Sequence, residues 1–333
     1  MKEANTNSIT QCETQFSIED LAIFDDEMLR FILSNCGLGL TVEKLARSLH
    51  GVNEGLIQRI ERNLLLSQRP VFLHELHRPL SEELVQTDRS SVLQALFWEL
   101  TYWKTPGLYE ELIEGEQLHP GIFQQLEPDI RNKVVLDAGA GSGRATFECV
   151  QYGARQIYAI EPSPGLLRIL CQKLIRQKEP YRVMPLQGRF DKLPLADNSV
   201  DTALSCSAFT SDPVHGGEPG LNELRRVTKS GGKLIIIWPR AEDLEWFQEH
   251  NFCYVSIPVQ KEMCIRFRTI WSAVRSVQHF YANNSRVVDY IVRERKPEIP
   301  FSMLGVNPPC DYCWLKVQKC DHEDTFGDHL TLS

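Results

Sequence analysis

The feature that most constrains this chain begins at residue 131, where short apolar runs typical of β-strands alternate with helical stretches. Alternation of this kind forms right-handed β-α-β units, because a twisted strand followed by a helix packs back onto the sheet in only that sense. Such units build a parallel sheet that is covered by helices on both faces. We therefore expect an α/β fold whose ligand site lies beyond the carboxyl ends of the strands.

The first of these strands runs into a glycine-rich loop, which has the composition of a ligand-binding loop. Residues 134–147 read VVLDAGAGSGRATF, so three glycines alternate with small residues between Asp137 and Arg144. Glycine lets a ligand lie against bare backbone, and the next helix offers unpaired N–H groups at its N-terminus. The spacing is GxGxG, and Arg144 stands where the third glycine of a GxGxxG dinucleotide fingerprint would be. A pyrophosphate is therefore not the best fit.

An acidic residue completes this predicted site. Glu161 ends the next strand, twenty residues beyond Gly141. An ionised carboxylate in that place can accept two hydrogen bonds from the vicinal hydroxyls of a ribose. The loop and the acid therefore predict one nucleoside site. By themselves they do not separate nicotinamide dinucleotides from other adenosine cofactors.

Four segments between about residues 134 and 238 resemble the class I S-adenosylmethionine-dependent methyltransferases of type 11, a family that includes quinone-biosynthesis C-methyltransferases. They read VVLDAGAGSGRAT, AIEPSPGLL, LQGRFDKLPLADNSVDTALSC and LNELRRVTKSGGKLIII. The resemblance covers a third of the chain. It implies an enzyme with a Rossmann-like, seven-stranded methyltransferase sheet and S-adenosyl-L-methionine as cofactor. It also implies that the loop holds the amino-acid part of the cofactor and that Glu161 holds its ribose.

Loop chemistry and resemblance together predict a set of cofactor-binding residues at the strand ends. The set is Asp137, Gly139, Ala140, Gly141, Gly143, Glu161, Pro162, Phe190, Asp191 and Ser205.

The chain departs from the family at the adenine end of this predicted site. Arg189 stands where family members usually carry the Asp that bonds the adenine amino group. We therefore expect Asp191 or the backbone to recognise adenine and Phe190 to cover the ring face. Simple core packing is the alternative role for Phe190.

Methyl transfer from a sulfonium is a direct displacement, so the protein has to position the nucleophile and exclude water. The loop after the fourth strand carries three candidates for this chemistry, Phe209, Asp212 and His215. We expect Phe209 to face the substrate, and His215, ahead of Asp212, to act as a general base, because its ordinary pKa lies near the working pH. Alternatively, His215 is solvated and Asp212 starts a turn before Pro213.

A second group of candidates lies just upstream of the glycine loop, in the segment 109–120. We expect Tyr109, Glu116 and His119 to touch cofactor or substrate from a capping helix. The alternative is an exposed amphipathic helix.

The first 130 residues are predicted to be helical behind a polar tail. The expected boundaries are a disordered tail over 1–16, a helical N-terminal domain over 17–88, connecting and cofactor-capping helices over 89–130, the methyltransferase domain over 131–320 and a tail over 321–333.

Within the N-terminal domain, the spacing predicts one helix over 17–35 and two short helices capped by Thr41 and Asn53. Two short helices joined by a glycine-bearing turn form a helix-turn-helix-like pattern. Residues 41–65 carry four basic and three acidic side chains, a net of +1, which is weak support for DNA binding. We therefore expect a lid or a homodimer contact, with a DNA-binding regulator as the alternative.

A cysteine cluster near the C-terminus raises the question of a metal site. The cluster consists of side chains that can bind zinc, namely Cys310, Cys313, Cys320 and His322. The two pairs flank a predicted strand, however, and no second zinc knuckle is present in the sequence to close the tetrahedral site. No metal is expected there.

These observations predict a methyltransferase that acts on a small molecule, with a macromolecular acceptor, a cofactor-binding regulator and a nucleotide-dependent oxidoreductase as alternatives. The net charge of −8 makes nucleic acid an unlikely partner. No apolar run is long enough to span a membrane, and the polar start is unlike a signal peptide, so we expect a cytoplasmic protein. The sequence identifies neither the acceptor nor its reacting atom.

Overall fold

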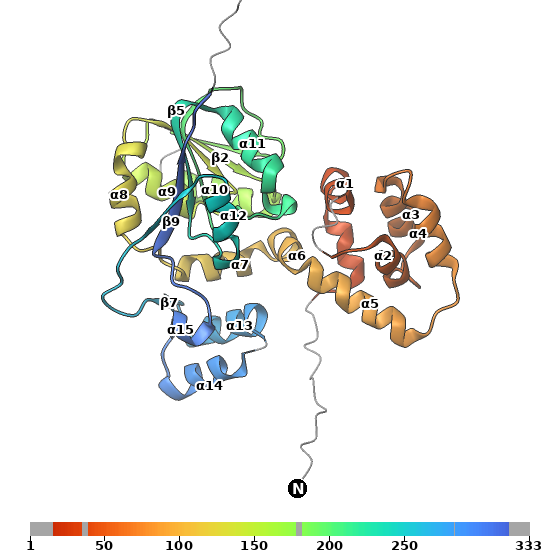
Figure 1. Cartoon of the computed structure of the whole chain (residues 1–333). Helices are drawn as coiled ribbons and strands as arrows, with labels where there is room; N and C mark the ends of the chain where they lie inside the picture. The colour runs from red at the N-terminus through yellow and green to blue at the C-terminus, as the bar shows by residue number, and fades with distance from the viewer. Residues whose placement is uncertain (1–15, 35–38, 178–181, 283, 320–333) are drawn as a thin grey trace, which may run out of the picture.

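The computed structural model of the chain describes residues 16–34, 39–177, 182–282 and 284–319 (Figure 1). We name three parts of it. The helical unit is residues 16–104, the sheet domain is residues 105–256 with 311–319, and the inserted unit is residues 257–310. Figure 1 shows the helical unit beside the sheet domain, joined to it through α5 and α6, and the inserted unit on another side of the sheet domain.

The helical unit consists of short helices around one apolar core. They are η1 Ile18–Ile23, α1 Asp26–Ser34, α2 Val42–Ser48, α3 Glu54–Asn63, α4 Arg69–His77, α5 Glu82–Ala95 and α6 Phe97–Lys104. The predicted caps of α2 and α3 are confirmed, because the Thr41 side chain accepts the N–H of Lys44 and the Asn53 side chain accepts that of Gly55. Each cap satisfies an N–H group that a helix start leaves unpaired.

The single helix predicted over 17–35 is wrong. The chain is extended at Phe24, and the Asp25 carboxylate accepts the N–H of Met28 to start α1. Arg59 of α3 donates to the carbonyl oxygens of Ala22 and Phe24, which the break leaves available. The apolar spacing continues across the break, so the pattern alone did not reveal it.

Three of the expected boundaries meet described residues, and the one between residues 130 and 131 falls where the helix Gly121–Ile130 ends. Phe16, the last residue of the predicted tail, is buried, with its ring 6.0 Å from that of Phe97. The boundary between residues 88 and 89 falls inside the single helix α5. Residues 1–15 and the predicted tail over 321–333 lie outside the described residues.

The sheet domain contains the predicted seven-stranded sheet. Its strands are β1 Val134–Ala138, β2 Gln156–Glu161, β3 Val183–Gln187, β4 Val200–Cys206, β5 Thr228–Ile237, β6 Cys253–Ser256 and β9 Asp311–Lys316. They lie in the order β3-β2-β1-β4-β5-β9-β6, with β1 to β5 parallel and β9 antiparallel to both of its neighbours. The order reverses between β1 and β4, and ligands of such sheets bind at that switch point.

Helices cover both faces of the sheet, as predicted. The helices of the sheet domain are α7 Pro106–Gly115, α8 Gly121–Ile130, α9 Arg144–Gln151, α10 Pro164–Gln177, η3 Pro213–His215, α11 Gly217–Val227, η4 Ala241–Asp243 and α12 Leu244–Glu249, and those that pack on the sheet are α8 to α12. Successive strand residues point to opposite faces, so Val135 packs with α8 to α10 while Leu136 packs with α11 and α12. Both faces are therefore apolar cores, which explains the continuous apolar runs of the strands.

The inserted unit lies between β6 and β9 in sequence. It contains β7 Cys264–Arg266, α13 Ile270–Phe280, α14 Ser285–Glu294, β8 Glu298–Pro300 and α15 Phe301–Leu304. Its own apolar core includes Leu112 of α7. At Gly115 of α7 a Cβ atom would lie 2.9 Å from the carbonyl oxygen of Arg266, so the two segments pack at backbone distance. Helix α7 is thus fixed between the sheet domain and the inserted unit.

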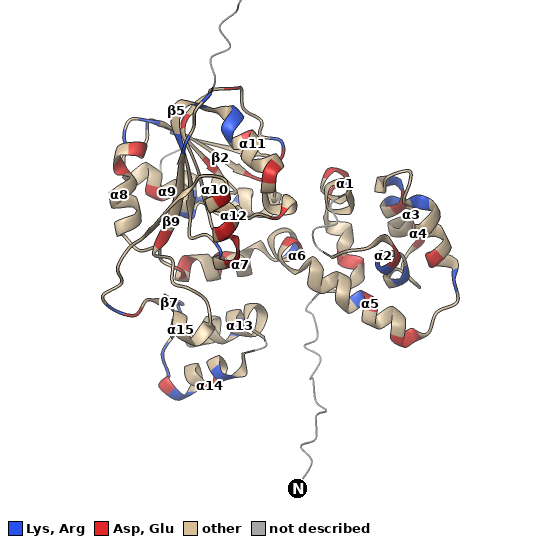
Figure 2. Cartoon of the chain, viewed as in Figure 1, with Lys and Arg blue, Asp and Glu red and all other residues tan. Residues whose placement is uncertain are grey.

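Charged side chains of both signs are interspersed over the ribbon (Figure 2). Within the described ranges, no helix combines the length and apolarity that crossing a membrane demands.

Candidate functional site

The glycine loop joins β1 to α9 at the switch point of the sheet. Gly139, Gly141 and Gly143 all have positive φ, at 70°, 55° and 100°. A Cβ atom at Gly143 would lie 2.6 Å from Cδ1 of Leu170, whereas the nearest contact of one at Gly141 would be Tyr109, at 4.0 Å. Gly143 is therefore required by packing, while Gly141 faces open space.

That space is a cavity of about 20 Å³ beside the loop, bounded by Tyr109, Asp137, Gly141 and Arg144. It holds about one water molecule. The cavity is much smaller than a nucleoside, and Tyr109 of α7 closes it on one side. Tyr109, which was expected to touch cofactor or substrate, lies beside the glycine loop, and its contact with a ligand stays a prediction.

Asp137 lies fully buried at the base of the loop. Burial raises the pKa of its carboxyl to about 6, although the hydroxyl of Thr146, which donates to Oδ2 at 2.5 Å, opposes that rise. Among the residues that the structure describes, Oδ1 of Asp137 and the hydroxyls of Ser142 and Ser205 have no hydrogen-bond partner. Unpaired buried polar atoms are costly, so they are ready to bond a polar ligand.

Glu161 is brought to the loop, as its spacing predicts. Its carboxylate accepts the N–H of Gly141 at 2.9 Å and that of Ser163 at 2.8 Å. Burial raises the pKa of Glu161 to about 7, and the two backbone N–H groups oppose that rise. The residue that the resemblance assigns to a ribose therefore holds the backbone of the loop in this arrangement.

Arg144 is a site residue that the sequence reasoning treated only as a mismatch. Its side chain is 12% exposed, and Nη1 lies 3.2 Å from Oε2 of Glu116. Nη2 donates to the hydroxyl of Ser207 at 2.5 Å, and the guanidinium lies 5.5 Å from the ring of Trp238. Burial raises the pKa of Glu116, and the nearby guanidinium counteracts this. Glu116, one of the predicted site residues, is thus linked to the glycine loop by its ion pair with Arg144.

Ser207 and Trp238 share an unusual backbone conformation. They follow β4 and β5 and have φ values of 57° and 54°, in the left-handed region that non-glycine residues rarely adopt. Strained positions of this kind cluster at functional sites. Both side chains contact Arg144, so the two strained residues lie beside one buried cation. Serine and tryptophan are not residue types that indicate a positive φ, so these two positions could not be recognised from the sequence.

His119 lies at the start of α8. The ring atom Nδ1 of His119 accepts the backbone N–H of Gly121 at 3.1 Å, and the backbone N–H of His119 donates to the carbonyl of Pro309. The residue does not line the cavity beside the glycine loop. The structure therefore places it with the helix start and not with the loop.

The loop after β4 packs the ring of Phe209 into the core. This ring is buried, 5.2 Å from that of Phe190 and 6.2 Å from that of Phe247. Phe209 thus packs in the apolar core in this structure, and its contact with substrate stays a prediction. Phe190 packs on Phe209, and its ring also lies 3.0 Å from where a Cβ atom of Gly139 would be. Its contact with adenine stays a prediction.

The two candidate catalytic residues have different surroundings. The Nε2 atom of His215 lies 3.0 Å from Oε1 of Glu99, a buried carboxylate of α6. Asp212 accepts the N–H of Val214 and so caps the turn η3. Glu99 was missed because it lies in another helix 116 residues away along the chain. Only tertiary structure could pair it with the histidine.

Asp191 accepts two hydrogen bonds from Arg189, at 3.0 and 3.2 Å. The carboxylate expected to recognise adenine is therefore engaged by the arginine that replaces the family's acid.

For the cysteine cluster, Cys313 is buried in β9 and Cys310 precedes that strand, while Cys320 and His322 lie outside the described residues. Where the structure describes the chain, no three His, Cys, Asp or Glu side chains form a group that could hold a metal ion.

Known proteins share the central segment of this chain. Residues 136–236 match the family model described as a methyltransferase domain. An uncharacterized methyltransferase of Mycobacterium tuberculosis is 36% identical over 117 residues, which are 34% of this chain and 44% of that protein. The histone-arginine methyltransferase CARMER of Anopheles gambiae is 35% identical over 121 residues, 36% of this chain and 19% of that protein.

Among solved structures, an S-adenosylmethionine-dependent methyltransferase from Aquifex aeolicus is 22% identical, with 45% of this chain and 89% of that chain covered and a TM-score of 0.39. The observed strand order, not this similarity, defines the fold.

Fold and site define an α/β protein of the Rossmann-like class, with a nucleoside-type loop at the switch point of its sheet. The matched segment contains that loop and β2 to β4 in full. This segment matches the methyltransferase-domain family of type 11, as its motifs predicted. The chain spans under half of the length of the first curated relatives, 44%, and the family match does not include the helical unit.

Proposed function

We propose that this protein transfers a methyl group from S-adenosylmethionine to a small-molecule acceptor by direct displacement. The observation that carries the proposal is the meeting of the glycine loop and Glu161, with the Gly141 N–H 2.9 Å from the carboxylate. A ligand with vicinal hydroxyls replaces this N–H as hydrogen-bond donor to Glu161.

The unpaired polar atoms support the placement of the rest of the cofactor. Oδ1 of Asp137 can accept a hydrogen bond from the ammonium of the amino-acid part, and the Ser205 hydroxyl lies at the neighbouring strand end. The cation of Arg144 can bind a carboxylate, either that of the cofactor or one on the acceptor. The cofactor supplies the activated methyl group, so no enzyme residue has to bond to substrate covalently.

For the acceptor, we propose His215 as general base and Glu99 as its positioning residue. In the tautomer that donates from Nε2 to Glu99, the Nδ1 atom is the one that accepts a proton. The buried carboxylate also stabilises the imidazolium that forms, as an acid behind a catalytic histidine does in general.

A small-molecule acceptor fits the charge distribution better than nucleic acid does. Three of the four basic side chains of the helix-turn-helix-like segment bond within the helical unit: Arg47 to Asp88, Arg59 to Asp26 and Lys44 to Ser91. Few cations of that segment therefore remain for phosphates, and the chain is acidic as a whole. A DNA-binding regulator would need a basic face.

Calorimetric titration with S-adenosylhomocysteine tests the cofactor site. We expect wild-type protein to bind in the micromolar range and both Gly141→Arg and Glu161→Ala to lose measurable binding. Gly231→Arg is the matched control, because this glycine also has positive φ and no atom within 4 Å of an added Cβ. Unchanged affinity in both site variants contradicts the proposal. Stabilisation by NADH but not by S-adenosylhomocysteine in a thermal-shift assay favours the oxidoreductase.

Incubation of a metabolite extract with methyl-labelled cofactor, followed by mass identification of the product, tests the acceptor class. Label found only in protein or nucleic acid contradicts the small-molecule assignment.

A further inference from the structure

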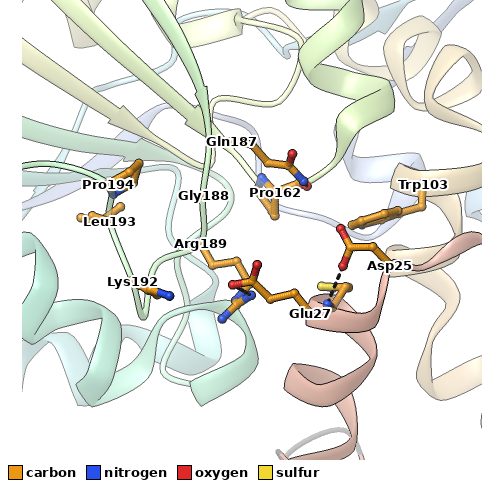
Figure 3. Close-up of a pocket in the computed structure, with 11 residues that line it drawn as sticks. Asp25, Glu27, Trp103, Pro162, Gln187, Gly188, Arg189, Lys192, Leu193 and Pro194 are labelled. Carbon is orange, nitrogen blue, oxygen red and sulfur yellow. Dashed lines mark hydrogen bonds and ion pairs between the residues drawn. The ribbon is translucent and has the colours of Figure 1, made fainter. Parts of the chain in front are cut away.

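A groove of about 390 Å³ separates the helical unit from the sheet domain. Figure 3 shows Asp25, which precedes α1, Glu27 of α1 and Trp103 of α6 on one side of it, and Pro162 and Arg189 on the other. None of the predicted cofactor residues except Pro162 lines it. The groove therefore needs an explanation of its own.

The groove begins where the glycine-loop site ends. Pro162 follows Glu161 directly, and Gln187 is the partner of Glu161 in the register of β2 and β3. The amide of Gln187 also donates to the carbonyl of Pro162 at 3.3 Å. A flat ring attached to a sugar at Glu161 would therefore pass over Pro162 and enter the groove.

The lining favours a neutral planar ring over a phosphate. The indole of Trp103 and the rings of Pro162 and Pro194 offer apolar surface for stacking. The charged side chains balance, with two carboxylates against Arg189 and Lys192. Because the groove has no excess of positive charge, its lining would not compensate the negative charge of a phosphate.

Arg189 joins the two sides of the groove. Its guanidinium lies 3.0 Å from Asp191 of its own loop and 3.1 Å from Glu27 of the helical unit. It also lies 4.5 Å from the ring of Phe31, again in α1. The arginine that replaces an acidic residue of the family thus contacts a helix that the family match does not include.

We propose that the helical unit forms the outer wall of the base-binding site, as a lid that Arg189 and Glu27 hold shut over the adenine of the cofactor. Trp103 stacks on the base. The Asp25 oxygen not bonded to Met28 accepts a hydrogen bond from the exocyclic amino group. This assignment rests on the proposed function, because it needs the cofactor to bind at the glycine loop.

Calorimetry with S-adenosylhomocysteine and with its 6-oxo analogue, S-inosylhomocysteine, tests whether Trp103 and Asp25 bind the base. We expect Trp103→Leu to weaken binding of S-adenosylhomocysteine roughly tenfold or more, since base stacking on an aromatic ring is lost. Asp25→Asn should reduce the preference for the amino compound over the oxo compound, while an Asn side chain still caps α1. Trp271→Leu, at a largely exposed tryptophan of α13, is the control and should change neither value.

Hydrogen exchange of α1 tests the lid. We expect saturating S-adenosylhomocysteine to slow exchange in Asp26–Ser34 of wild-type protein, and to slow it less in Glu27→Gln. The control for Glu27→Gln is Glu245→Gln, an exposed acid of α12.

Wild-type binding with unchanged affinity in Trp103→Leu and unchanged α1 exchange would overturn the lid and leave the cofactor site intact. No binding of S-adenosylhomocysteine to wild-type protein would overturn both.

Discussion

The helical unit and the sheet domain are stabilised in different ways. In the sheet domain, alternate residues of β1 and β5 pack into two apolar cores, and helices close each face. In the helical unit, arginines join helices to one another around a single core. Arg47 of α2 bonds Asp88 of α5 and Glu75 of α4, and Arg59 of α3 bonds Asp26 of α1.

This difference shows which features of each part can be recognised from the sequence. The sheet domain presents backbone at the strand ends, and its glycines mark that backbone in the sequence. The helical unit acts through side chains that meet across large separations along the chain, and their partners are invisible until the chain folds. Three predictions test this contrast, from the largest expected effect to the smallest.

Phe72→Ala and Phe123→Ala should separate the two parts as folding units. Both rings are almost fully buried, one in the core of the helical unit and the other beneath the sheet. Removing either should cost about 3–5 kcal/mol of unfolding free energy, from lost burial and the cavity that remains. In urea unfolding followed by circular dichroism and tryptophan fluorescence, each variant should shift a different transition. A single transition that both variants shift equally would show one cooperative unit.

Glu161→Gln should flatten the pH dependence of stability. The folded-state pKa of Glu161, about 7, lies above the ordinary value of 4.5, and that of Asp137, about 6, lies above 3.8. Between about pH 4 and pH 7 these two carboxyls lose protons in the unfolded chain that they keep in the folded protein, so their contribution to stability falls as pH rises through this window. The share of Glu161 is at most about 3 kcal/mol.

Urea unfolding at pH 5 and pH 8 checks this prediction. Wild-type protein should be less stable at pH 8 than at pH 5, and Glu161→Gln should reduce the gap. Glu245→Gln, at an exposed position, should keep the wild-type gap. An identical gap in all three proteins would contradict the assignment.

Thr41→Ala should give the smallest effect. The threonine hydroxyl accepts the N–H of Lys44 at the start of α2, and losing this cap should cost about 1 kcal/mol. The loss should appear only in the unfolding transition of the helical unit. Thr87→Ala, at an exposed site within α5, is the matched control and should cost less than about 0.5 kcal/mol. Equal losses in both variants would contradict the role of the cap.

Much of the sheet domain could be predicted from the sequence, while much of the site could not. The runs that became β1 and β2 stand out because strands buried on both faces are continuously apolar. The placement of Glu161 beside Gly141 follows from adjacent parallel strands, whose carboxyl ends meet at one edge. The burial of Phe209 could not be predicted, because a phenylalanine in a glycine- and proline-rich loop has the same composition whether it faces a ligand or the core.

Sequence patterns could not predict which residues pair with the buried charges. Glu99 reaches His215 from a different helix, and Glu27 reaches Arg189 from a different unit. Local spacing fixes which face of a helix a side chain occupies, and the packing of elements decides what that face meets.

The sequence by itself determined the α/β class, the glycine loop and the acid that faces it, because backbone conformation and strand burial depend on local residue types. Only the tertiary structure decided that Arg144 lies buried beside Glu116, that α7 closes over the loop, and that the helical unit borders a groove next to Glu161. These contacts join segments far apart in the chain, and their free energy comes from packing and charge pairing that exist only once the elements have docked.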